Sequence, residues 1–80
     1  MTQDYYADAH SLAARLDEAG FIAEAEQLRD AIRNGSTSTE ILMRLRWELA
    51  KLSKSALPLT PSLRRDAETL EHAIRSALNP

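Results

Sequence analysis

Residues 35–52, GSTSTEILMRLRWELAKL, carry the clearest helix-start signal of the chain and hold its only tryptophan. Thr37 is followed three residues later by Glu40, a spacing typical of a capping box. In such a box each side chain accepts a hydrogen bond from the other residue's backbone N–H. We therefore predict a helix that begins in this polar run. It should end near Ser55, because Pro58 forbids further extension.

This helix has apolar side chains on two faces. At about 100° per residue, the first face falls within roughly 80° and consists of Leu42, Leu45, Leu49 and Leu52, with Ile41 beside them. The second is an apolar stripe of Met43, Trp47 and Ala50, centred about 160° from the first. A helix that is apolar on both sides normally lies between two layers, whereas a four-helix bundle gives each helix one inward face. The apolar stripe therefore needs a further neighbour.

A second copy of the chain is the simplest neighbour for this stripe. Met43 and Trp47 would be the anchors, since Trp is a preferred interface residue. Arg44, Arg46 and Lys51 would form a basic rim that selects acidic partners, including the N-terminal acids of a second copy. Two alternatives stay open. The helix could lie at the centre of a three-layer monomer, or the tryptophan could be exposed without a role.

Apolar periodicity predicts three further helices. They cover residues 4–19, closed by Gly20; residues 22–33; and residues 61–78, with Thr60 as N-cap. In each of these helices, the apolar residues that should face the core recur at spacings of three and four. They are Tyr5, Ala9, Leu12, Leu16 and Ala19 in the first helix; Phe21, Ala25, Leu28 and Ile32 in the second; and Leu63, Ala67, Leu70, Ile74 and Ala77 in the last. The outward face of the last helix would carry Arg64, Glu68, His72 and Arg75.

Composition agrees with an all-α fold. The chain has 80 residues, of which 44% are hydrophobic and 28% charged, with 2 Gly and 3 Pro. We predict that residues 1–80 form a single helical domain, a four-helix bundle built from an N-terminal αα-hairpin plus two longer helices. The leucine-containing linker 56–59 should lie against the core. A chain this short buries only about 60–65% of its unfolded surface, so self-association would help its stability.

Charge is unevenly distributed along the chain. Residues 1–40 hold eight acidic and three basic side chains, whereas residues 41–65 hold six basic and one acidic. This asymmetry indicates internal pairing or head-to-tail charge matching with another copy. An uneven scatter of solvated charges is the simpler explanation. The net charge of −2 favours no class of partner by itself.

Several classes of function lack sequence support. Without cysteine there is no disulfide, thiolate metal site or Cys nucleophile, and no phosphate-binding glycine motif is present. Glu68 and His72 stand at i, i+4 and could give a metal two ligands, but such pairs are common on solvated helices. We therefore expect no catalysis, cofactor, metal or small-molecule substrate. With no membrane span or secretory signal in the sequence, we expect a cytoplasmic location.

The sequence thus predicts a small non-catalytic interaction or regulatory domain that forms a homodimer through the Met43/Trp47 face. The alternative is a helix-turn-helix nucleic-acid regulator, because residues 28–49 read as helix, glycine-containing turn and helix. Its reading helix would offer Arg44 and Arg46, with Arg64 and Arg65 at phosphates. A pI near 5.6 and the acidic flanks disfavour this alternative.

Overall fold

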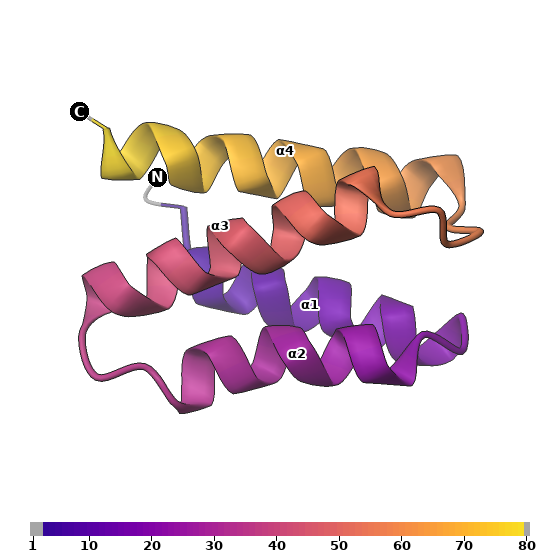
Figure 1. Cartoon of the computed structure of the whole chain (residues 1–80), viewed down its shortest axis with the longest axis horizontal. Coiled ribbons are helices and arrows are strands. Elements are labelled where there is room, and N and C mark those ends of the chain that lie inside the picture. The colour runs from indigo at the N-terminus through magenta and orange to yellow at the C-terminus, as the bar shows by residue number, and fades with distance from the viewer. Residues whose placement is uncertain (1–2, 80) are drawn as a thin grey trace.

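Four helices make up the described part of the chain, residues 3–79 of the computed structural model (Figure 1). They are α1 (Tyr5–Glu18), α2 (Ile22–Arg33), α3 (Ser38–Lys54) and α4 (Pro61–Leu78). The first two span 14 and 12 residues, and the last two 17 and 18. The predicted all-α fold, a hairpin followed by two longer helices, is confirmed.

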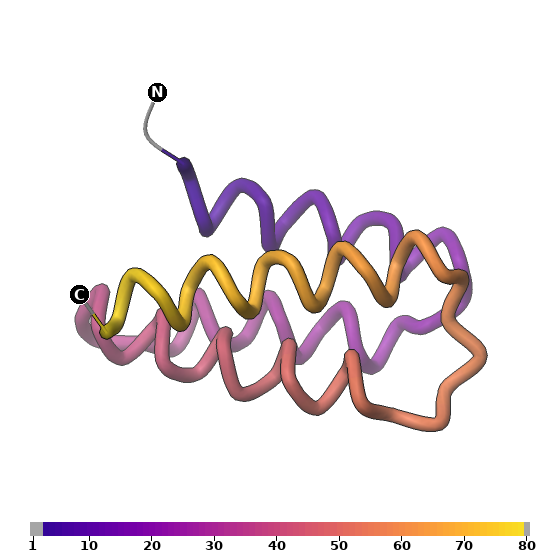
Figure 2. The backbone as a smooth tube through the Cα atoms, turned by 90° about the horizontal axis from the view of Figure 1, so that it is seen from above, coloured from indigo at the N-terminus to yellow at the C-terminus, as the bar shows by residue number. Residues whose placement is uncertain are grey.

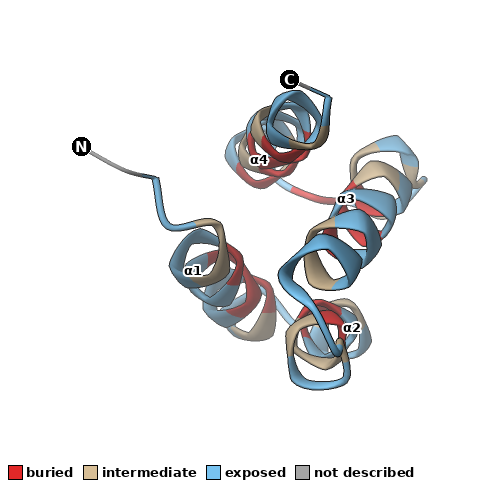
Figure 3. Cartoon of the chain, turned by 90° about the vertical axis from the view of Figure 1, so that its left-hand side faces the viewer, coloured by how far each residue is buried: buried red, intermediate tan, exposed pale blue. Residues whose placement is uncertain are grey.

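The helices form an up-and-down bundle. Consecutive helices run in opposite directions (Figure 2), and contacts join α1 to α2, α2 to α3, α3 to α4 and α4 back to α1. Seen end-on, their buried faces turn toward a shared interior (Figure 3). That core consists of Ala9, Leu12, Ala13, Leu16, Ala25, Leu28, Ala31, Leu45, Leu49, Leu52, Leu59, Leu63, Ala67, Leu70 and Ile74. The most extensive contact lies between α3 and α4.

Gly20 closes α1 in a Schellman motif. Its φ of +93° lies in the left-handed region, where a residue with a side chain would be strained. The N–H of Phe21 donates to the carbonyl of Leu16 at 2.8 Å, and the N–H of Gly20 donates to that of Asp17 at 3.0 Å. This turn folds the chain back into α2 and confirms the predicted hairpin.

α3 begins at the predicted cap, with one difference. The hydroxyl of Thr37 accepts a hydrogen bond from the Glu40 N–H at 3.2 Å. The Glu40 carboxylate does not return to Thr37 as a full capping box requires; it reaches one residue further back, to the N–H of Ser36 at 3.2 Å. A Cβ at Gly35 would lie 2.2 Å from Cγ1 of Ile41, so glycine lets the first turn of α3 approach this loop closely.

The connection to α4 also follows its sequence signals. Thr60 accepts a hydrogen bond from the Leu63 N–H at 3.1 Å, and Pro61 occupies the first turn, where a missing N–H is harmless. Leu59 is buried and Leu57 is half-buried against the core. The linker therefore packs inward, as predicted.

Arg64 does not lie on the outward face of α4, where the sequence predicted it. Its side chain is half-buried, and its guanidinium donates to the carbonyls of Ser53 at 2.5 Å, Ser55 at 3.1 Å and Leu57 at 2.8 Å. These carbonyls belong to the end of α3 and to the linker, where backbone carbonyls have no N–H partner within the helix. Arg64 thus ties α4 to the C-terminus of α3.

Two predicted core alanines and two acidic residues also differ from expectation. Ala19 and Ala77 are exposed: Ala19 is the C-cap that follows the last helical residue of α1, and Ala77 lies three residues past Ile74, the last buried residue of α4. Glu48 and Glu71, which the periodicity did not place in the core, are the buried charged residues of the described chain.

Ion pairs do not explain the charge asymmetry. Over residues 3–79 they join Arg15 to Asp66, Arg29 to Asp17 and Glu26, Arg33 to Glu26 and Asp30, Lys51 to Glu48, and Arg75 to Glu71. The hydrogen bond to Asp17 raises the pKa of Arg29. None of these pairs links an acid of residues 1–40 to a base of residues 41–65. The predicted internal pairing of the two segments is absent from the described chain.

Candidate interaction surface on the third helix

The apolar stripe of α3 lies on the outside of the bundle. Trp47 is 58% exposed and Met43 is 55% exposed, while Ala50 is half-buried. The opposite side of the helix holds its buried residues, among them Leu45 and Leu49. Burial of the tryptophan inside a three-layer monomer, one of the open alternatives, is therefore not what the structure shows.

Few other large apolar side chains of the described chain are so exposed. Ile22, at the first turn of α2, is the remaining one at 65%. It stands alone, whereas Met43 and Trp47 are four residues apart on one helix face. Single exposed apolar residues are ordinary, but a paired Met and Trp form a patch of the kind found at interfaces.

The predicted basic rim surrounds this patch unevenly. Arg44 and Arg46 are exposed and form no ion pair within residues 3–79. Lys51 is engaged within its own helix: its ammonium nitrogen lies 4.0 Å from the centre of the Trp47 ring and 3.0 Å from Oε1 of Glu48. The two arginines are therefore the free cations of the predicted rim, and Lys51 supports the indole.

Glu48 is the residue of this region that sequence reasoning missed. Its side chain is 6% exposed, and although Lys51 lies within ion-pair distance, no donor forms a well-aligned hydrogen bond to Oε1. It faces the side of α3 next to α2, where it lines a groove of about 290 Å³ together with Glu24 and Leu28. Helical periodicity places residue 48 at the edge of the core face, so spacing puts it beside the core but does not show that α2 covers it.

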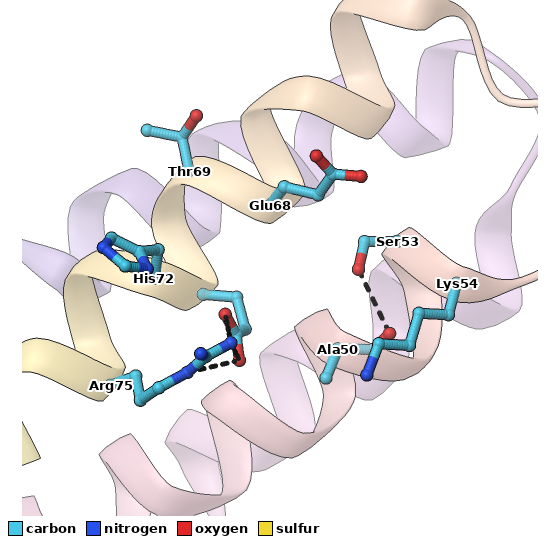
Figure 4. A pocket seen from close by; sticks show the side chains of 8 residues that line it. Ala50, Ser53, Lys54, Glu68, Thr69, His72 and Arg75 are labelled. Atoms are coloured by element: carbon cyan, nitrogen blue, oxygen red, sulfur yellow. Dashed lines mark hydrogen bonds and ion pairs between the residues drawn. The ribbon is translucent and has the colours of Figure 1, made fainter.

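A second groove, of about 490 Å³, separates the stripe from α4 (Figure 4). Ala50 belongs to its α3 wall, and Glu68 and His72 to its α4 wall. The buried Glu71 is held by Arg75 through contacts of 2.7 Å to both carboxylate oxygens. Across residues 3–79, no set of three or more His, Cys, Asp or Glu side chains is arranged to hold a metal ion.

Comparison with known proteins adds no relative. No family model, curated protein or solved structure matches this chain. Within the described residues, no helix combines the length and the hydrophobicity needed to cross a bilayer. The surface of α3 is therefore the feature from which a function can be inferred.

Proposed function

We propose that this chain is a small non-catalytic interaction domain, regulatory in role, that self-associates through the Met43/Trp47 face of α3. The observation that carries the proposal is the exposure of both side chains, 55% and 58%, on the middle of one helix. The free cations Arg44 and Arg46 flank the same face. Aromatic residues and Met are enriched in protein interfaces.

The energetics favour a weak dimer. Covering the exposed parts of Met43 and Trp47 in two copies contributes on the order of 5–10 kcal/mol at about 25 cal/mol per Å² of apolar area. Association itself costs about 4–15 kcal/mol. We therefore expect a dissociation constant in the micromolar range or weaker, on the order of 1 µM to 1 mM.

Sedimentation equilibrium across that concentration range tests the proposal. The wild type should pass from monomer to dimer, and Trp47→Ala should remain monomeric at concentrations where the wild type dimerises. Ile22→Ala is the matched control, because it truncates another large apolar side chain that is more than half exposed, on a different helix. A wild type that stays monomeric throughout, or an equal loss of dimer in Ile22→Ala, would refute the role of this face.

The helix-turn-helix alternative stays a prediction. Helices α2 and α3 run side by side in opposite directions (Figure 1), whereas a helix-turn-helix crosses at about 90–120°. Titration of random duplex DNA at low salt addresses it directly. Binding that weakens steeply as salt rises would favour that alternative over self-association.

A further inference from the structure

The apolar stripe is the centre of a longer seam on the outside of α3. Glu40, Met43, Trp47, Ala50 and Lys54 follow one another at spacings of three, four, three and four residues. We call these five residues the α3 seam. All are exposed except the half-buried Ala50. Alternating spacings of three and four are the pattern of a two-helix contact, in which one helix face meets another along its length.

Charge at the two ends of the seam has opposite sign. Glu40 lies seven residues before Trp47 and Lys54 seven residues after it, so each stands about 10 Å from the tryptophan along the helix. Neither side chain forms an ion pair within residues 3–79. Among the described residues, the Glu40 carboxylate accepts only the N–H of Ser36, through Oε2, which leaves acceptor capacity on this carboxylate.

We propose that a second copy of this chain packs on the seam with its α3 antiparallel, about a twofold axis that passes near Trp47. This proposal rests on the self-association proposed above and specifies its geometry. The symmetric arrangement sets Glu40 of each copy opposite Lys54 of the other, so two opposite-charge pairs close the ends of a Met–Trp–Ala centre. A parallel pair would instead set Glu40 against Glu40 and Lys54 against Lys54, which repels at both ends.

The flanks of the seam agree with a weak contact. On the side next to α2, Arg44 of one copy approaches Lys51 of the other, whose charge is already paired with Glu48. On the side next to α4, the two copies of Arg46 approach each other near the axis. These like charges limit the affinity. The attraction therefore comes from the apolar centre and from the two Glu40–Lys54 pairs.

Charge reversal tests the geometry. Glu40→Lys alone and Lys54→Glu alone each create two like-charge pairs in a homodimer, and each should weaken self-association about tenfold or more. An equimolar mixture of the two variants forms a heterodimer in which both pairs are again opposite in sign. The mixture should therefore associate nearly as tightly as the wild type, within about threefold.

The outcomes separate the two proposals. A monomeric wild type overturns both. If the wild type dimerises but a mixture of the two charge variants does not regain its affinity, the antiparallel geometry is wrong and the proposal of self-association stands. Glu40→Gln is the control for the helix start, since Gln serves at the third position of a capping box. The Glu40→Gln dimer should lose the attraction to Lys54 of the other copy without gaining a repulsion. Its dissociation constant should therefore fall between those of the wild type and Glu40→Lys.

Cysteine pairing gives a second readout if a charge variant does not fold. The natural chain has no cysteine, so introduced thiols are unique. Under mild oxidation, Glu40→Cys mixed with Lys54→Cys should yield a mixed disulfide dimer, and neither variant alone should crosslink efficiently. Crosslinking of Glu40→Cys to itself would instead establish a parallel pair and overturn the proposal.

Discussion

The ammonium nitrogen of Lys51 lies 4.0 Å from the centre of the Trp47 ring, above one face of the indole. The same nitrogen lies 3.0 Å from Oε1 of the buried Glu48. One cation therefore joins the exposed apolar stripe to a carboxylate that is largely shielded from water. A cation over an indole at an exposed site contributes about 0.5–1 kcal/mol and restricts where the ring can lie. Trp47 is thus restricted in the free chain, which would lower the entropy lost in the self-association proposed above.

Lys51→Met should lower the free energy of unfolding by about 1–2 kcal/mol, because it leaves the buried Glu48 without its cation while it keeps an apolar stem. Urea unfolding followed by circular dichroism measures the change. Adding Glu48→Gln to Lys51→Met should recover most of the loss, since the amide needs no counter-charge. If Lys51→Met is as stable as the wild type, the ion pair does not contribute to folding.

Trp47→Ala should change monomer stability by less than about 1 kcal/mol, because the side chain is mostly exposed. Leu49→Ala is the contrasting variant two residues away. It removes a fully buried side chain and should cost about 2–5 kcal/mol. Denaturant unfolding at a concentration where the wild type is monomeric compares them. Global unfolding caused by Trp47→Ala would mean that the indole belongs to the core.

The fluorescence of the single tryptophan should report association directly. In the dilute monomer, Trp47 should emit as a hydrated indole and be quenched readily by iodide. As concentration rises, its emission should shift to shorter wavelength and quenching should fall, because a partner would exclude water from the ring. The transition should coincide with the mass change seen by sedimentation. If the chain dimerises but the emission spectrum does not change with concentration, the interface does not include Trp47.

Arg64→Lys should destabilise the bundle by about 1–3 kcal/mol, because one ammonium cannot serve three separated carbonyls as the planar guanidinium does. Arg65→Lys makes the same change at an exposed neighbour with no hydrogen bond in the described chain, and it should be nearly neutral. Thermal unfolding of the two variants gives the comparison. Equal effects at both positions would show that the carbonyl contacts add nothing to stability.

Much of the fold was predictable because its signals are local. The turn at Gly20 closes α1 through two short-range hydrogen bonds, from the N–H of Gly20 to Asp17 and from the N–H of Phe21 to Leu16. The Thr37 and Thr60 caps act on N–H groups three positions later. The periodicity of apolar residues then indicated which face of each helix turns inward. For the same reason the candidate site is predictable, since residue spacing alone indicates the two apolar faces of α3.

Other features depend on which helices become neighbours. Periodicity predicts Arg64 on the outward face of α4, yet the carbonyls that it binds lie within its reach only because α3 ends beside α4. The burial of Glu48 likewise depends on α2 packing along α3. Spacing along one helix contains no information about the groups that face it across the bundle.

The sequence by itself thus determined four amphipathic helices, the glycine that closes α1, the threonines that begin α3 and α4, and the second apolar face of α3, because each of these follows from interactions within a few residues of one another. Only the tertiary structure decided that Trp47 stands outside the bundle. Four helices packed in a ring bury one side of each, and α3 meets α2 and α4 with the Leu45/Leu49 side turned inward. The opposite side, with its tryptophan, is left facing away from the core.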